Sequence, residues 1–200
     1  MLVIGLTGPS GAGKGEVSRI LQGYGANIID ADAVYHALLI PPSPCLDALR
    51  ERFGAEILTP MGELDRKKLG GIVFANPDAL HDLNAIAHRF VMEDVRSKLN
   101  TLRATDTKIA VLDAPQLFEA GAERDCDTVI SVLADKQTRA ARIMARDGID
   151  EAAAYRRINA QLDDTYFRAH SDHIIENNGT AEELLPKVRR ILCEIGGIAE

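Results

Sequence analysis

The residues best suited to chemistry form a glycine-rich stretch near the start of the chain. Residues 8–14 read Gly-Pro-Ser-Gly-Ala-Gly-Lys, after an apolar run at 2–7 and before Val17, Ile20 and Leu21 at helical spacing. Glycines let successive backbone N–H groups point at one anion, and a helix N-terminus adds about half a positive charge. Lys14 adds a full charge on a flexible stem. This order of strand, turn, lysine and helix predicts a phosphate-binding P-loop and a nucleotide site.

The position after the lysine departs from the usual P-loop pattern. A Ser or Thr hydroxyl is expected there as a ligand to Mg²⁺. Here Gly15 follows Lys14, and Glu16 comes next. Two readings stay open: water and another carboxylate hold the metal, or the metal dependence is altered.

Two aspartates, Asp30 and Asp32, lie at the end of the next predicted strand, 27–30. The carboxyl ends of strands are where open α/β sheets bind ligands. One of the two could accept the proton of a hydroxyl that attacks a nucleotide γ-phosphate. Alternatively, either caps the helix that begins near Ala33. Alternation along an extended chain would place both carboxylates on one face.

A third aspartate, Asp113, ends the predicted strand 108–113. In a P-loop protein this is the expected place for a ligand to metal-bound water. Because Gly15 has no hydroxyl to bind the metal, a carboxylate at this place becomes more important. We therefore expect Asp113 to be an indirect Mg²⁺ ligand. The competing interpretation is an ordinary turn carboxylate.

Arginines three and four residues apart, Arg139, Arg142 and Arg146, follow the predicted strand 127–133. On a helix they share one face, where like charges repel by a few tenths of a kcal/mol per pair. A polyphosphate ligand would reverse that sign, although a solvated basic face is the alternative. The polar, arginine-bearing residues 148–168 are typical of a lid that closes over ATP.

The predicted elements define a three-layer α/β architecture with a five-stranded parallel sheet, the P-loop NTPase fold. The expected core is 1–32, 103–147 and 169–200, within a single kinase domain. No strand is predicted from 31 to 107, so residues 33–102 are expected to form a helical insertion that shapes the pocket for a second substrate. The polar candidates in this insertion are Arg66, Asn84, His88 and Arg89. Helix starts are predicted at Asn76-Pro77 and, through a capping box, at Thr180 and Glu183.

Composition excludes several classes of protein. The 200 residues are 46% hydrophobic and 26% charged, as in an ordinary soluble domain. A net charge of −7 without a basic, aromatic stripe argues against nucleic acid as a ligand. Neither a membrane span nor a signal peptide is visible, and three scattered cysteines suit a reducing compartment. These observations predict a cytoplasmic protein without a membrane partner; they leave its oligomeric state open.

The combination of these motifs resembles the dephospho-coenzyme A kinase family over nearly the whole chain. The opening strand and loop at 4–14 and the isoleucine-aspartate-alanine-aspartate run at 29–32 are similar to the family's signatures. Further similar segments are 62–69, 74–77, 84–88, 115–119, 142–147, 157–161 and 171–179. The chain departs from the family at Gly15, at Arg89, where a proline is usual, and at Gln116, which replaces a leucine.

The resemblance implies transfer of the γ-phosphoryl group of ATP, with Mg²⁺, to the ribose 3′-hydroxyl of dephospho-CoA. It assigns catalytic roles to Asp32 as the base, Lys14 and Arg142. It implies an ATP site made of Gly8, Ser10, Gly11, Ala12, Gly13, Lys14, Gly15, Glu16, Arg142, Arg146 and Asn178. It implies substrate contacts from Asp32, Arg66, Asn84, His88 and Arg157. Two alternatives remain open: a nucleoside or nucleoside-monophosphate kinase, and an ATP-binding protein that no longer catalyses.

Overall fold

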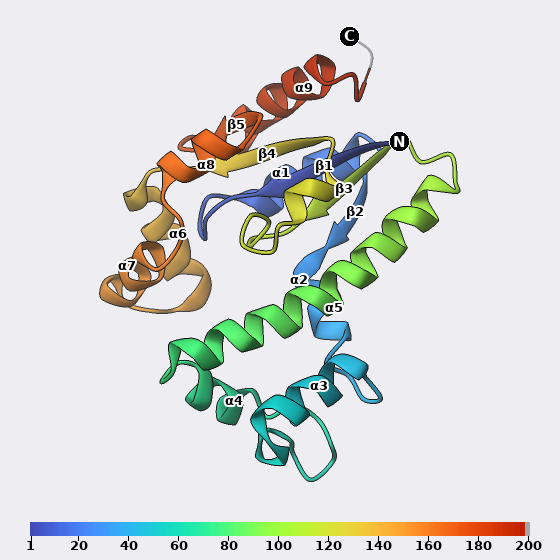
Figure 1. The fold of residues 1–200 in the computed structure, drawn as a ribbon. Helices are drawn as coiled ribbons and strands as arrows, with labels where there is room; N and C mark the ends of the chain where they lie inside the picture. Colours follow the sequence, from blue (N-terminus) through green and yellow to red (C-terminus); the bar gives the residue numbers. More distant parts are fainter. Residues whose placement is uncertain (199–200) are drawn as a thin grey trace. The chain divides into compact units, whose positions relative to one another are not determined.

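A five-stranded sheet organises the computed structural model, which describes residues 1–198. The strand order is β2-β3-β1-β4-β5, and β1 pairs in parallel with both β3 and β4 (Figure 1). The strands are β1 (Leu2–Thr7), β2 (Asn27–Asp30), β3 (Ile109–Asp113), β4 (Thr128–Leu133) and β5 (His173–Glu176). This confirms the predicted α/β class. Parallel pairing needs crossover connections, which the intervening helices supply.

Helices connect the strands. They are α1 (Lys14–Gly23), α2 (Ala31–Ala37), α3 (Pro44–Phe53), α4 (Arg66–Val73), α5 (Pro77–Arg103), α6 (Lys136–Asp147), α7 (Glu151–Asn159), α8 (Asp164–His170) and α9 (Leu184–Glu194). None of the helices among residues 1–198 is long and apolar enough to cross a membrane.

The chain divides into two compact units, 1–29 with 101–200, and 30–100. The first unit contains the glycine-rich loop and the core of the sheet. Ile4, Leu6 and Val111 of the strands pack with Val17 of α1 and Val188 of α9, all fully buried or nearly so. Burial on both faces explains why these strands read as apolar runs rather than as alternating patterns.

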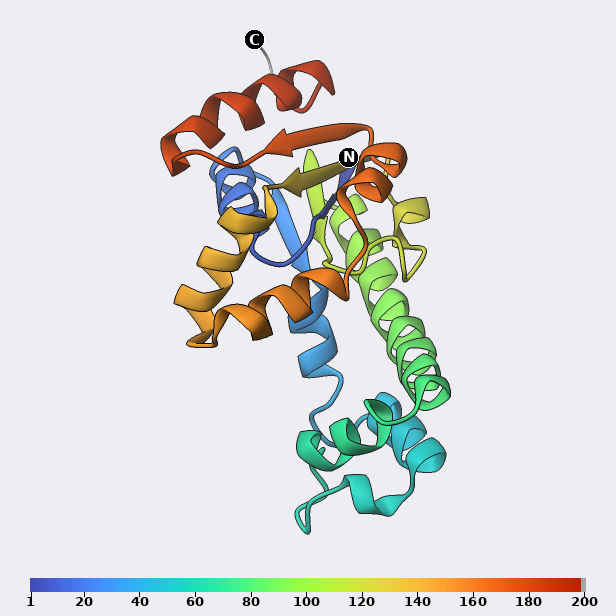
Figure 2. The same ribbon diagram turned by 90° about the vertical axis from the view of Figure 1, so that its left-hand side faces the viewer.

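Within the first unit, α6 and α7 meet through their own small core. A turn at Gly148, where φ is +65°, ends α6, and the two helices then lie against each other (Figure 2). Ala140 and Ile143 of α6 pack with Ala154 and Ile158 of α7. The segment predicted as a lid, 148–168, thus contains α7 and most of α8.

The second unit has a separate core. Leu49 and Phe53 of α3, Leu69 of α4 and Ala79 of α5 are buried together. The predicted cap is confirmed, because the side-chain oxygen Oδ1 of Asn76 accepts hydrogen bonds from two backbone N–H groups at the start of α5.

The predicted capping box at Thr180 is wrong. Thr180 makes no side-chain cap, and residues 181–183 form a 3₁₀ turn before α9. The Thr180 hydroxyl instead interacts with the Glu182 carboxylate, and Glu183 folds back over Gly179. Pro186 does not delay the helix, which begins two residues before it, because the first turn needs no N–H donor there.

Candidate active site

The glycine-rich loop follows β1 and adopts a conformation that requires its glycines. Gly8, Gly11 and Gly13 have φ values of +144°, +81° and +94°, a region that side chains disfavour. A Cβ at Gly8 would stand 2.2 Å from the Val132 carbonyl oxygen, and one at Gly13 would stand 2.1 Å from Asn177 Nδ2. The loop therefore packs directly against neighbouring backbone and side chains, as the sequence pattern predicts for a phosphate loop.

The buried side chain of Arg139 forms a hydrogen bond with this loop. Its side chain is 1% exposed, and its Nε donates to the Ser10 carbonyl oxygen at 3.0 Å. Gln161 Oε1 accepts from Arg139 Nη2 at 3.3 Å and from the Ser10 N–H at 3.0 Å. Burial lowers the pKa of the guanidinium, and Asp164 at 3.6 Å opposes that shift. Arg139 is thus a structural brace, which its place in the arginine series did not reveal.

Arg142 and Asn177 also form hydrogen bonds with the loop. Arg142 Nη1 donates to the Asn177 carbonyl oxygen at 2.9 Å, and Asn177 Nδ2 donates to the Ala12 carbonyl oxygen at 2.7 Å. Asn178, which the resemblance assigns to the ATP site, accepts a hydrogen bond from the Asp135 N–H at 2.8 Å. Sequence reasoning missed Asn177, although its position directly after β5 could have indicated it.

Lys14 forms an ion pair with Asp113 at the end of β3. The two side chains are 19% and 9% exposed, and the register of β1 against β3 places Asp113 opposite Leu6. Because β1 and β3 are neighbours, Asp113 at the end of β3 lies beside the loop that follows β1, and Lys14 at the end of that loop reaches it. An incoming phosphate would compete with Asp113 for Lys14.

Gly15 differs from the other loop glycines, since nothing lies within 4 Å of the position where its Cβ would stand. The residue is exposed, and it is the second residue of α1. Its neighbour Glu16 pairs with Arg19. The backbone therefore places no steric demand for glycine at this position.

Two further arginines share one carboxylate at the end of α6. Asp147 accepts from Arg146 Nε and Nη2 at 2.8 and 2.9 Å and also pairs with Arg157. Hydrogen bonds from Arg146, then from Arg157, lower the pKa of Asp147 to about 2. Arg146 and Arg157 remain 59% and 45% exposed, so both are accessible to solvent and to a ligand.

In the second unit, the structure separates the two aspartates that the sequence left equivalent. Asp30 Oδ1 accepts from the N–H groups of Asp32 and Ala33 at 2.9 and 3.1 Å, so Asp30 is the N-cap of α2. Asp32 lies in the first helical turn. The expectation that the two alternate along an extended chain is wrong, because the strand ends at Asp30.

The other substrate candidates also belong to this unit. Arg66 Nη1 lies 3.4 Å from His36 Nε2. Asn84 and His88 are half-buried and four residues apart on α5, so they share a helix face. The guanidinium carbon of Arg89 lies 4.4 Å from the centre of the Phe90 ring, so this cation stacks on its neighbour in the chain.

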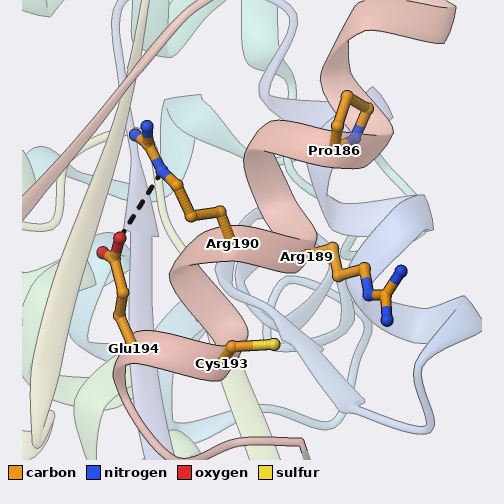
Figure 3. Close-up of a pocket in the computed structure, with 5 residues that line it drawn as sticks. All are labelled: Pro186, Arg189, Arg190, Cys193 and Glu194. Atoms are coloured by element: carbon orange, nitrogen blue, oxygen red, sulfur yellow. Dashed lines mark ion pairs between the residues drawn. The ribbon is translucent and has the colours of Figure 1, made fainter. Parts of the chain in front are cut away.

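A shallow concavity on α9 contains none of the loop residues. Pro186, Arg189, Arg190, Cys193 and Glu194 line it. Figure 3 shows the two arginines pointing in different directions, and Arg190 pairs with Glu194 at 3.5 Å. The arginines do not converge on a single anion, and the phosphate-binding geometry stays with the glycine-rich loop.

The parallel sheet, the glycine-rich loop at the end of β1 and the lysine that opens α1 define a P-loop kinase. The family model for dephospho-CoA kinase matches residues 2–183, and the chain belongs to that family.

Individual relatives agree with this assignment. A dephospho-CoA kinase of Geobacter metallireducens is 43% identical over 183 residues, which cover 92% of this chain and 91% of the relative. A solved dephospho-CoA kinase from Campylobacter jejuni is 26% identical with a TM-score of 0.71 and covers 98% of both chains. A crystal structure from Thermus thermophilus is 29% identical with a TM-score of 0.79 and covers 97% of both chains.

Proposed function

We propose that this chain transfers the γ-phosphoryl group of ATP to the ribose 3′-hydroxyl of dephospho-CoA and so makes coenzyme A. The observation that carries the proposal is the braced loop with Lys14 paired to Asp113, in a chain of the dephospho-CoA kinase family. Phosphoryl transfer needs positioning and charge neutralisation more than covalent chemistry. A rigid loop with a lysine at its end meets that need.

The loop and its cations hold the nucleotide in this proposal. Backbone N–H groups of the glycine-rich loop and of the start of α1 surround the phosphates, and Lys14 leaves Asp113 to neutralise the transferring group. Arg142 lies next to the loop carbonyls through its bond to Asn177, which supports a contact with the same phosphates. The exposed Arg146 and Arg157 add charge from α6 and α7.

Asp32 is the group that receives the proton of the attacking hydroxyl in this proposal. Asp30 caps the helix, and Asp32 is an exposed carboxylate in the first turn of α2. A carboxylate is a suitable base for a ribose hydroxyl because it orients the nucleophile and accepts its proton as the P–O bond forms. Arg66, Asn84 and His88 are proposed to contact the rest of the acceptor.

The residues at the loop fit Mg²⁺, although with fewer protein ligands than usual. Magnesium in kinases keeps several waters and binds one or two carboxylates together with substrate phosphates. Asp113 would hold it through water, since Gly15 offers no hydroxyl. The bound ion would offset the charge that builds on the phosphate oxygens.

The test is ADP release with Mg-ATP and dephospho-CoA, run beside AMP, CMP and adenosine. We expect turnover with dephospho-CoA and at least a hundred-fold loss of kcat in Asp32→Asn. The matched control is Asp30→Asn, because asparagine caps helices as well as aspartate and activity should persist. Preference for a nucleoside monophosphate would refute the acceptor, and ATP binding without turnover would favour a non-catalytic protein.

A further inference from the structure

An apolar pocket in the second unit has no role in the chemistry described so far. It is an open pocket lined by residues of α2, α4, α5 and their connections, and its walls include Leu39, Leu69, Val73 and Leu83. Its volume is about 170 Å³. An apolar cavity of about 150 Å³ holds a benzene molecule, so this pocket suits a compact apolar group of similar size.

The mouth of the pocket combines an aromatic ring with one cation. Phe74 lines the pocket yet is 84% exposed, which is unusual for a large apolar side chain. Arg66 also lines it, and its guanidinium lies beside His36. Burial raises the pKa of the Tyr35 phenol on the pocket wall, whereas Arg66 opposes that shift. The ligand that fits is apolar at one end and anionic where it leaves the pocket.

The order of these groups follows α2 away from the proposed base. Asp32 lies in the first turn of α2, Tyr35 and His36 follow one turn later, and Leu39 lies just beyond the helix. Side chains three and four residues apart share a helix face, so Asp32 is on the same side as Tyr35 and His36. A ligand along this face meets a carboxylate, then the Arg66 cation, then the apolar pocket.

We propose that this pocket binds the gem-dimethyl pantoyl segment of dephospho-CoA and that Arg66 binds the adjoining pyrophosphate. The proposal rests on the function proposed above. In dephospho-CoA the ribose hydroxyl, the pyrophosphate and the branched pantoyl carbon follow one another in this same order. The pantoyl group is compact and apolar and is bonded directly to an anion, which matches the pocket and its mouth.

The first test fills the pocket from α4. Gly70 lines it, and a Cβ there would touch the Phe74 ring at 3.4 Å, so Gly70→Leu places its side chain in the pocket. Gly71→Leu is the matched control, because nothing lies within 4 Å of a Cβ at that position. We expect Gly70→Leu to raise the KM for dephospho-CoA about ten-fold, the factor for losing two buried methyl groups. The KM for ATP should stay unchanged.

The second test removes the cation without touching the core. Arg66→Gln should weaken both dephospho-CoA and the probe pantetheine 4′-phosphate about ten-fold, because a charge-assisted hydrogen bond is lost. Lys67→Gln, the adjacent exposed position, is the control and should bind both as the parent does. If Gly70→Leu does not fold, Arg66→Gln decides, since Arg66 is exposed and carries little of the core.

Calorimetric binding of pantetheine 4′-phosphate separates this proposal from the proposed function, because it requires no turnover. Equal KM values for dephospho-CoA in Gly70→Leu and Gly71→Leu, or equal probe affinity in Arg66→Gln and Lys67→Gln, would overturn the pocket assignment while leaving the kinase activity standing. Probe binding that follows the pocket in a chain that does not phosphorylate dephospho-CoA would leave the pocket standing and refute the function.

Discussion

Gly15 offers the sharpest test of the site, because the structure predicts that a side chain is tolerated there. Nothing lies within 4 Å of a Cβ, and the residue is helical without a positive φ. The other loop glycines would clash, as the contact of a Cβ at Gly13 with Asn177 illustrates. We therefore expect Gly15→Ala and Gly15→Ser to fold and to bind ATP.

The magnitude follows from helix propensity and chain entropy. Glycine inside a helix is about 1 kcal/mol less favourable than alanine, and a position in the first turn recovers about half of that. Gly15→Ala should raise the free energy of unfolding by about 0.5 kcal/mol, which is about 1–2 °C in Tm for a chain of this size. Gly15→Ser should gain less.

The serine variant also supplies the missing hydroxyl. We expect Gly15→Ser to reach half-maximal rate at a lower Mg²⁺ concentration than Gly15→Ala, because the hydroxyl adds an oxygen ligand. Initial rates over a Mg²⁺ series, together with urea unfolding, measure both effects. A ten-fold loss of kcat/KM for ATP in Gly15→Ala would refute the reasoning, since it would mean that the nucleotide itself needs the space.

Three other outcomes are expected. Arg139→Met should lower the free energy of unfolding by about 2–3 kcal/mol in thermal or urea unfolding, because a buried loop carbonyl loses a charged donor; an unchanged Tm would contradict its role as a brace. Gly13→Ala should weaken ATP binding at least ten-fold by calorimetry, because the new Cβ at residue 13 would displace Asn177. Gly15→Ala should leave ATP binding unchanged. The pKa of Asp147 falls from 3.8 to about 2 on folding, so its contribution is present above pH 3.8 and is lost as the pH falls toward 2. In Asp147→Asn the free energy of unfolding should therefore fall less steeply between pH 3.8 and about 2 than in the parent protein, as measured by unfolding at a series of acidic pH values.

Local signals were sufficient for the architecture and for the loop. The run from β1 through the loop to α1 is contiguous, and Gly8, Gly11 and Gly13 each have a positive φ that favours glycine. The strand at 27–30 was predicted at its observed bounds, because an apolar run there ends in an aspartate. Asp113 was expected at a strand tip for the same reason.

Choices between neighbouring residues could not be made from the sequence. Arg139 and Arg142 have the same residue type and share a helix, yet one is a buried brace and the other reaches the end of β5. Asn177 and Asn178 are adjacent, and only Asn177 contacts the loop. Asp30 and Asp32 became distinguishable once α2 was seen to begin at Ala31.

The sequence alone determined the residue types that phosphate binding needs and the order of strands and helices that carries them. Tertiary structure decided which contacts each member of a similar pair makes, as for Asn177 and Asn178. The Arg139 bond to Ser10 spans 129 residues and the Asn177 bond to Ala12 spans 165, so no local pattern encodes them. Burial then sets the outcome, because a buried donor or acceptor must find a partner and only the folded chain brings that partner near.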